Sequence, residues 1–199
     1  MDRLVIATHN RKKAGEMVTI LGRRFPELEI LTLADFPEAP EPEETGTTYA
    51  ENASIKVRSA VMATGEWCVA DDAGLEIDAM PEELGVWSKR FAGEDTPFPE
   101  KMRLILDRME GLPDDKRGAR FRCSVALGSP KGSLEVFEAT CEGMIARHPS
   151  GAGGFGYDPI FWLTELGCTM ADLSADQKHS ISHRGKVLTK LGERLQELT

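Results

Sequence analysis

Cysteines are too few and too scattered to suggest a zinc cage or a disulfide framework. The chain has 199 residues and four cysteines, and none of the four belongs to a CxxC pair. Metal cages and disulfide-rich secreted domains depend on close cysteine spacing, so both classes are disfavoured. We therefore expect a reducing, cytoplasmic environment for this chain.

Long apolar runs and a basic excess are also missing. No stretch approaches the roughly 20 apolar residues of a membrane span, and the apolar run near the N-terminus is too short for a signal peptide. Asp and Glu outnumber Lys and Arg by 33 to 24, which gives a net charge of −9. Such a protein is not expected to bind nucleic acid or an anionic membrane nonspecifically. A polyanionic ligand would need a local cationic pocket or a bridging metal ion.

The remaining composition is that of a globular α/β protein, with 41% hydrophobic and 29% charged residues. No linker or internal repeat interrupts the chain, so we expect one domain over residues 1–199. β-branched and alternating runs predict strands over 3–8, 28–33, 67–71, 119–128 and 133–146. Apolar residues at helical spacing predict helices over about 11–21, 48–64, 99–110 and from 182 onward.

Two adjacent acids, Asp71 and Asp72, follow an apolar run in "VADDAGLEIDAM". Adjacent anions repel unless a turn solvates them or a cation binds them. We expect the strand to end at this pair, with one acid facing a metal and the other bracing the loop. Mg²⁺ typically takes one or two carboxylates beside substrate phosphates. The alternative is an ordinary Asp-Asp-x-Gly hairpin turn.

The stretch "THNRKK", residues 8–13, lies at a predicted strand-to-helix junction. The unpaired N–H groups and positive dipole end of a helix start favour an anion there, and Lys13 adds a mobile positive charge. The alternative is a helix cap with a solvated basic face. Lys56 lies one helical turn after Asn52, so both could line a cleft, although an ordinary exposed lysine fits equally. Before that helix, Glu43 and Glu44 are either solvated charges or metal ligands.

Two further stretches could recognise a base. In "GAGGFGYDP" (151–159), glycines alternate with Phe155 and Tyr157, whose rings suit stacking on a planar base. Asp158 precedes a proline and is therefore expected to be extended, with its carboxylate aimed at ring nitrogens. The alternative is a glycine loop with core aromatics.

The second stretch, "KHSISHRGK" (178–186), is basic in an acidic protein. Its Lys178, His183 and Arg184 could neutralise phosphate or donate to a base carbonyl, and the alternative is a solvated helix start. A cation in the first turn of a helix is unfavourable on dipole grounds, which favours a ligand role for His183 and Arg184.

Six stretches together resemble the inosine triphosphate pyrophosphatase family, whose members hydrolyse non-standard purine nucleoside triphosphates. In chain order they are "IATHNRKKAGEM", "PEETGTTYAENASIKVRSA", "VADDAGLEID", "GVWSKRFAGED", "GGFGYDPIF" and "KHSISHRGKVLTKL". The resemblance implies an elongated, two-lobed α/β fold around a long mixed sheet with flanking helices. It also implies an active-site cleft between the lobes and a homodimer.

The resemblance further implies a role for each matched residue. Asp72 would accept a proton and bind Mg²⁺, with Asp71 and Glu43 completing the metal site and Lys13 and Lys56 assisting catalysis. The triphosphate would be held by Thr8, His9, Asn10, Arg11, Lys12 and Lys13. The base site would comprise Ala73, Phe155, Gly156, Tyr157, Asp158, Lys178, His183 and Arg184.

Three departures from the family pattern stand out. Ala73 replaces the usual serine, and one lost hydrogen bond of about 0.5–1.5 kcal/mol predicts weaker substrate binding rather than lost chemistry. Lys12 stands where glycine is typical. Leu84, directly before "GVWSKRF", replaces a proline, and Lys89 within it replaces a small residue.

The implied reaction cleaves ITP, dITP or XTP to the nucleoside monophosphate and pyrophosphate, with Asp72 orienting a water molecule toward the α-phosphorus. Fixed donors near His183 and Arg184 would accept a purine with a 6-keto group and reject adenine. Two alternatives remain: a pyrophosphatase for modified pyrimidine or methylated nucleotides, and a non-catalytic nucleotide-binding module, which Ala73 would favour.

Overall fold

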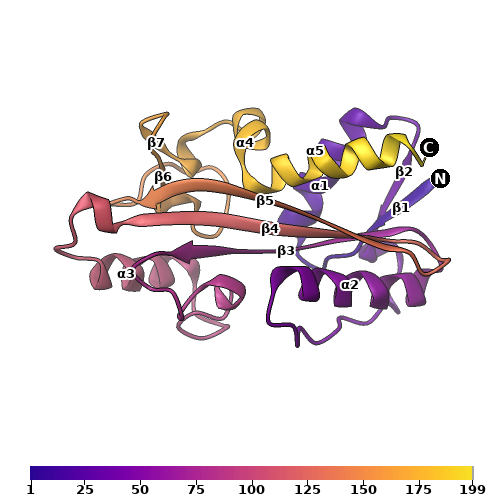
Figure 1. The fold of residues 1–199 in the computed structure, drawn as a ribbon, viewed down its shortest axis with the longest axis horizontal. Coiled ribbons are helices and arrows are strands. Elements are labelled where there is room, and N and C mark those ends of the chain that lie inside the picture. Colours follow the sequence, from indigo (N-terminus) through magenta and orange to yellow (C-terminus); the bar gives the residue numbers. More distant parts are fainter. Residues whose placement is uncertain (199) are drawn as a thin grey trace. The chain divides into compact units, whose positions relative to one another are not determined.

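The computed structural model describes residues 1–198 and shows an α/β fold built on one mixed sheet (Figure 1). Its seven strands are ordered β2-β1-β3-β4-β5-β6-β7. They are β1 (Arg3–Ile6), β2 (Glu29–Thr32), β3 (Cys68–Ile77), β4 (Gly118–Gly128), β5 (Leu134–Ile145), β6 (Phe161–Leu163) and β7 (Cys168–Thr169). β1 pairs in parallel with β2 and β3, whereas β6 pairs antiparallel with β5 and β7. The predicted fold class, a mixed sheet with flanking helices, is confirmed.

The helices flank this sheet. They are α1 (Arg11–Arg24), α2 (Tyr49–Thr64), α3 (Phe98–Arg108), α4 (Ala175–Ile181) and α5 (His183–Gln196). Five short 3-10 helices link them: η1 (Leu33–Asp35), η2 (Gly85–Trp87), η3 (Asp114–Lys116), η4 (Asp158–Ile160) and η5 (Met170–Asp172). Within residues 1–198, none of the helices has the length and apolar character needed to span a bilayer.

The chain divides into two compact units, each held together by its own internal contacts. Unit 1 comprises Met1–Asp72, Cys123–Ala139 and Arg184–Thr199, and unit 2 comprises Ala73–Arg122 and Thr140–His183. Strands β3, β4 and β5 each contribute residues to both units, so each unit is discontinuous in sequence. The expected single domain and the cleft between lobes stay predictions.

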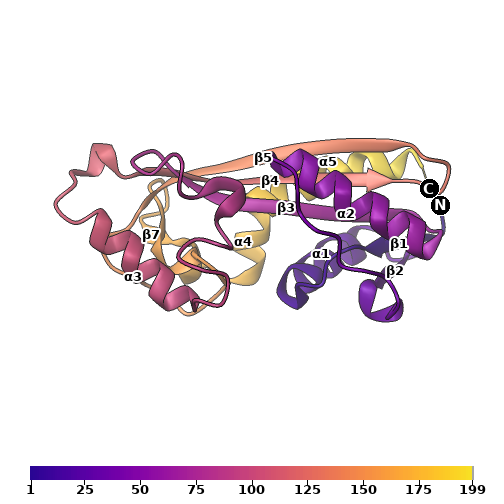
Figure 2. The same cartoon turned by 90° about the horizontal axis from the view of Figure 1, so that it is seen from below.

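Two helices of unit 1 begin at the capping residues that the sequence indicates. Asn10 caps α1 by accepting from the backbone N–H groups of Lys12 and Lys13. Thr48 and Glu51 form the predicted capping box of α2, which ends at Thr64 and is capped by Gly65 in the left-handed conformation. α2 and α5 lie on opposite faces of the strands (Figures 1 and 2). The buried stripe of α2 faces a core that includes Val5, Ala7, Ala53, Val57, Ala60 and Ala126.

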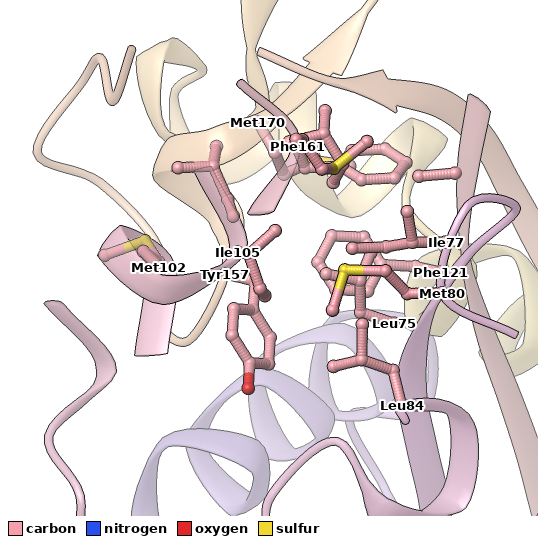
Figure 3. Close-up of a cluster of buried hydrophobic side chains, with 14 of the residues drawn as sticks. Leu75, Ile77, Met80, Leu84, Met102, Ile105, Phe121, Tyr157, Phe161 and Met170 are labelled. Carbon is pink, nitrogen blue, oxygen red and sulfur yellow. The ribbon is translucent and has the colours of Figure 1, made fainter. Parts of the chain in front are cut away.

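Unit 2 has its own apolar core (Figure 3). Leu75 and Ile77 of β3 meet Ile105 of α3 and Phe161 of β6 there, and all four are at most 2% exposed. Tyr157 belongs to the same cluster, with its ring among the apolar side chains. Unit 2 therefore has the buried apolar surface to stabilise its part of the fold.

The structure corrects the expected end of the third strand. β3 runs without interruption from Cys68 to Ile77, so Asp71 and Asp72 lie inside a strand and neither end it nor form a hairpin turn. The reason is that the strand continues to Leu75 and Ile77, whose side chains are buried in the core of unit 2. A second correction concerns α4, which precedes the predicted helix from 182 and begins with a capping box formed by Ser174 and Gln177.

We predict opposite effects on stability for alanine at two glycines. At Gly143 in β5, an added Cβ would lie 2.5 Å from the backbone oxygen of Trp162. Gly143→Ala should therefore lower the free energy of unfolding by about 1–3 kcal/mol through overpacking. Gly15 in α1 has open space around its Cβ position, so Gly15→Ala should raise it by about 0.5–1 kcal/mol. Urea titrations of both variants would check this; equal effects would contradict it.

Candidate functional site

Asp71 and Asp72 form the centre of a buried charged cluster in unit 1. Both are largely buried, with 1% and 6% of their surface exposed. β1 pairs with β3 just before them, and the backbone N–H of Ala7 donates to Val69 at 2.7 Å. The loop that follows β1 and leads into α1 therefore starts beside the two acids. This register brings the predicted phosphate loop and the predicted acidic pair together.

Asp71 is held by cations from two helices. Its Oδ2 accepts from Arg184 of α5, at 2.8 Å from Nη2 and 3.2 Å from Nε, and lies 3.3 Å from Nζ of Lys13 in α1. Burial alone would raise the pKa of Asp71, but Lys13, Arg184 and Lys56 outweigh it and hold that pKa well below its usual range. Asp71 is therefore a permanent anion at neutral pH.

The same arginine has a second carboxylate partner that the sequence did not suggest. Arg184 Nη1 donates to Oε2 of Glu16 at 2.8 Å, and only 3% of the arginine side chain is exposed. Glu16 lies three residues after Lys13, on the same side of α1, which is the one local signal that could have identified it. Arg184 is thus fixed between two carboxylates in unit 1, whereas the preceding residue, His183, is assigned to unit 2.

The carboxylate of Asp72 contacts fewer cations than that of Asp71. Its Oδ1 accepts from Lys56 Nζ at 3.0 Å, and its Oδ2 accepts from Asn52 Nδ2 at 3.2 Å. Burial raises the pKa of Asp72, and the attraction of Lys56 and Lys13 only partly opposes that effect. The pKa values of the two neighbouring acids are therefore shifted in opposite directions. Asp71 is held ionised, whereas Asp72 takes up a proton more readily than an ordinary aspartate.

Lys56 joins Asp72 to the loop that precedes α2. Its Nζ lies 2.7 Å from Oε1 of Glu44, 3.0 Å from Oδ1 of Asp72 and 3.2 Å from the backbone oxygen of Asp71. Burial lowers the pKa of Lys56, but the nearby carboxylates more than offset this and raise it. Glu44 is half-buried, whereas Glu43 is exposed. The structure thus brings Glu44, and not the expected Glu43, to the acidic pair.

Asn52 anchors this loop as well as Asp72. Its Oδ1 accepts from the backbone N–H of Gly46 at 2.8 Å, and the asparagine is completely buried. A Cβ at Gly46 would lie 2.6 Å from that same oxygen, so the close approach requires glycine. One amide side chain therefore fixes both the carboxylate of Asp72 and the loop that carries Glu44.

The residues of this cluster fit a divalent ion that arrives with phosphate. Among residues 1–198, no group of three or more His, Cys, Asp or Glu side chains forms a complete metal cage. Mg²⁺ needs only one or two carboxylates when phosphates and water supply its other ligands. Oxygens of Asp72 and Glu44 already converge on one cation, the Lys56 ammonium. Oδ1 of Asp71 is buried without a hydrogen-bond partner.

The start of α1 combines both interpretations of "THNRKK". Asn10 is committed to the helix cap, and Thr8 Oγ1 accepts from the Asn10 N–H at 3.2 Å. The first turn contains no acidic residue. The basic or polar side chains that remain exposed there are His9, Arg11 and Lys12. Backbone N–H groups, exposed cations and Lys13 together form an anion-attracting helix start.

Except for Arg184, the predicted base site lies in unit 2, where it is built on a buried ion pair. Oδ2 of Asp158 accepts from Lys178 Nζ at 2.7 Å and from the backbone N–H of Phe155 at 2.8 Å. Lys178 Nζ also lies 4.5 Å from the centre of the Phe155 ring. A Cβ at Gly154 would lie only 2.0 Å from Asp158 Oδ2, so the glycine is required. Asp158 is buried at the start of the 3-10 helix η4, and not extended as expected.

The other aromatic residues of this site are buried and fixed. Tyr157 is 4% exposed and its hydroxyl donates to the backbone oxygen of Ser88 at 2.7 Å, so its ring belongs to the core. Gly156 follows Phe155 with a positive φ of 67°. The ring of His183 stacks on Phe121 at 4.8 Å. Residues 151–159 form a glycine-rich strap. Phe155 is half-buried and is the ring of this strap best placed to meet a planar ligand.

Comparison with known proteins decides the family. The model of the Ham1 family matches residues 4–194. The chain belongs to the Ham1 family. The family resemblance found in the sequence is thereby confirmed over nearly the whole chain.

Relatives in the Ham1 family match along nearly their whole length. A protein of Geobacillus kaustophilus named dITP/XTP pyrophosphatase is 44% identical, and the match covers 100% of this chain and 96% of that protein. A protein of the same name from Desulforamulus reducens is 43% identical, covering 98% and 96%. The solved structure of a HAM1 protein from Coxiella burnetii has a TM-score of 0.88 at 38% identity, with 99% and 100% coverage.

We predict that Asp71 stabilises the fold in a pH-dependent way. Asp71→Asn leaves buried cations with one carboxylate fewer and should lower the free energy of unfolding by about 3 kcal/mol at pH 7. The folded-state pKa of Asp71 lies below the unfolded value of about 3.9. Its contribution is therefore complete above about pH 5 and is lost as pH falls through that unfolded value toward the folded one.

Urea unfolding of wild type and variant between pH 3 and pH 7 checks this. The difference between the two proteins should shrink as the pH falls. Asp114→Asn is the matched control, because the ion pair of Asp114 with Arg147 is exposed and should contribute no more than about 1 kcal/mol. A difference that stays constant with pH would contradict the prediction.

Proposed function

We propose that the chain hydrolyses non-standard purine nucleoside triphosphates such as dITP, XTP and ITP to the nucleoside monophosphate and pyrophosphate. The observation that carries this proposal is that the pKa values of two adjacent buried acids are shifted in opposite directions. Cations hold Asp71 as an anion, whereas burial raises the pKa of Asp72 against the attraction of Lys56 and Lys13. Two relatives over 40% identical are named dITP/XTP pyrophosphatase, which supports the same activity.

In the proposed reaction, Asp72 acts as the proton acceptor. A water oxygen forms a bond to the α-phosphorus while the bond from that phosphorus to the oxygen bridging to the β-phosphorus breaks. Pyrophosphate leaves, and the proton of the attacking water passes to Asp72. A raised pKa suits this role, because a general base works best when its pKa approaches the working pH. Asn52 keeps the carboxylate oriented by holding its other oxygen.

The cations of unit 1 would hold the triphosphate. Lys13, Lys56 and the first turn of α1 supply positive charge and N–H donors where negative charge develops. A bound divalent ion would supply further stabilisation of the transferring phosphoryl group. We assign its protein ligands to Asp72, Glu44 and Asp71, and we propose Mg²⁺ because carboxylates and phosphates are its preferred partners.

Unit 2 would recognise the base. Phe155 offers a ring for stacking, and the buried Asp158–Lys178 pair fixes the strap that presents it. Because Arg184 is committed to Asp71 and Glu16, we propose that the fixed ring of His183 is the donor to a 6-keto group. Adenine carries an amine there and would leave this buried donor unpaired, which is strongly disfavoured.

We further propose a cytoplasmic location and a homodimer, as the family resemblance implies. A nucleoside triphosphate is then the partner, with neither nucleic acid nor a membrane surface involved.

Asp72→Asn should lower kcat for pyrophosphate release from dITP by about 100- to 10,000-fold, the usual contribution of a general base. The amide has nearly the same shape, so the variant should keep the fold. Asp114→Asn changes charge in the same way at an exposed site and should keep wild-type turnover. A coupled pyrophosphate assay measures both, and near-wild-type turnover by Asp72→Asn would refute the role of Asp72.

A panel of nucleotides with Mg²⁺ tests the choice of base. We expect kcat/KM for dITP and XTP to exceed that for dATP by at least about 100-fold, since a keto group pairs with the donor and an amine does not. Preference for a modified pyrimidine or methylated nucleotide would favour the alternative substrate. Binding without metal-dependent turnover would indicate a binding module.

A further inference from the structure

The ammonium of Lys56 occupies a position formed by oxygen atoms alone. Its three nearest partners are Oε1 of Glu44, Oδ1 of Asp72 and the backbone oxygen of Asp71, at 2.7, 3.0 and 3.2 Å. Two carboxylates and a carbonyl are the ligands that a hard divalent cation prefers. In the free protein, therefore, a lysine fills the cation position of this cluster.

The oxygens around Lys56 are fixed, whereas Lys56 itself can move. Asn52 holds the second oxygen of Asp72, and through Gly46 it also anchors the loop carrying Glu44. Lysine has a flexible four-carbon stem and three rotatable donors, so its ammonium can change partners while its helix stays in place. The side chain retains 15% exposure, which leaves it an open side.

Arg184, one of the two cations that contact Asp71, has no such freedom. Arg184 makes two hydrogen bonds to Asp71 and a third to Glu16, and its side chain is 3% exposed. A planar guanidinium fixed at three points cannot leave without breaking all of them. Of Lys56 and Arg184, only Lys56 can vacate its carboxylates at low cost.

We propose that Lys56 closes the Asp72–Glu44 position to free divalent metal, and that the position opens only when the phosphates of a nucleotide draw the ammonium away. The inference rests on the proposed function, because it takes a nucleotide triphosphate as the ligand. Two cations cannot share this position, since like charges a few ångströms apart repel strongly in a partly buried site. Metal and nucleotide therefore bind together, as a metal–nucleotide complex.

Binding of Mn²⁺ alone to the nucleotide-free protein tests this directly, by electron paramagnetic resonance of the unbound ion. Wild type should bind Mn²⁺ weakly. Lys56→Gln removes the resident charge and should bind Mn²⁺ at least about tenfold more tightly, given the Coulomb energy at this separation. Lys56→Arg retains a cation and should stay weak. Lys190→Gln removes the same charge from an exposed lysine whose Nζ donates to the backbone oxygen of Glu138, and should match wild type.

Three results would overturn the proposal. These are tight Mn²⁺ binding by wild type alone, no tightening in Lys56→Gln, or equal tightening in Lys190→Gln. If Lys56→Gln does not fold, Lys56→Met makes the same comparison with the aliphatic stem retained. Wild type also supplies a test that needs no variant, with a dITP analogue that carries a methylene bridge between the α- and β-phosphorus. Protein and analogue together should bind Mn²⁺ at least about tenfold more tightly than the analogue alone binds it.

Mn²⁺ binding and pyrophosphate release test the role of Lys56 and the proposed function independently. Wild type that releases pyrophosphate from dITP but binds free Mn²⁺ tightly keeps the proposed function and loses the role of Lys56 as a gate. A protein with no turnover on any nucleotide, but with tighter Mn²⁺ binding in Lys56→Gln, loses the proposed function and keeps Lys56 as the resident cation.

Discussion

The structure of unit 1 depends on neutralising two adjacent carboxylates inside a strand. Asp71 and Asp72 are buried in β3, where each would be costly without a partner. Three helices each supply one cation: Lys13 from α1, Lys56 from α2 and Arg184 from α5. The acids therefore constrain how all three helices pack on the strands of this unit. A buried apolar pair would fill the same space with less desolvation, so the cluster is better explained by chemistry than by stability.

The differences among these cations produce the difference between the acids. Arg184 binds Asp71 through two hydrogen bonds and is itself held by Glu16, which makes the charge of Asp71 permanent. Asp72 has one lysine and one neutral amide, so desolvation dominates and its pKa rises. Two residues that are identical in sequence thus acquire separate roles from their partners. A strand geometry that sends neighbouring side chains in different directions makes this separation possible.

Local signals in the sequence predicted the parts of the fold that local interactions decide. The cap at Asn10, the capping box of Thr48 and Glu51 and the start of a helix near residue 182 follow from residues within one turn of each other. The acidic pair could also be picked out as a candidate site, because adjacent acids repel unless a cation binds them or a turn solvates them.

Long-range contacts decided what the sequence could not show. Arg184 binds Asp71 across 113 positions, and the buried hydroxyl of Tyr157 reaches Ser88 across 69. β3 continues past Asp72 because its later residues pack in unit 2, although the local composition is that of a turn. The choice of Glu44 over Glu43 depends on the anchor between Gly46 and Asn52, which no periodicity reveals.

The charge balance of the cluster explains why an acidic protein of this family would need a metal for a polyanionic substrate. Lys13, Lys56 and Arg184 face the carboxylates of Asp71, Asp72, Glu44 and Glu16, so three cations meet four anions and one negative charge remains. That remaining negative charge opposes the attraction that the basic start of α1 exerts on a triphosphate. A divalent ion carried by the phosphates reverses the sign of the local charge, and the freed Lys56 then adds to the attraction. The same balance disfavours free metal as long as Lys56 remains in place, so the acidic pair and its lysine together favour the metal–nucleotide complex over either component alone.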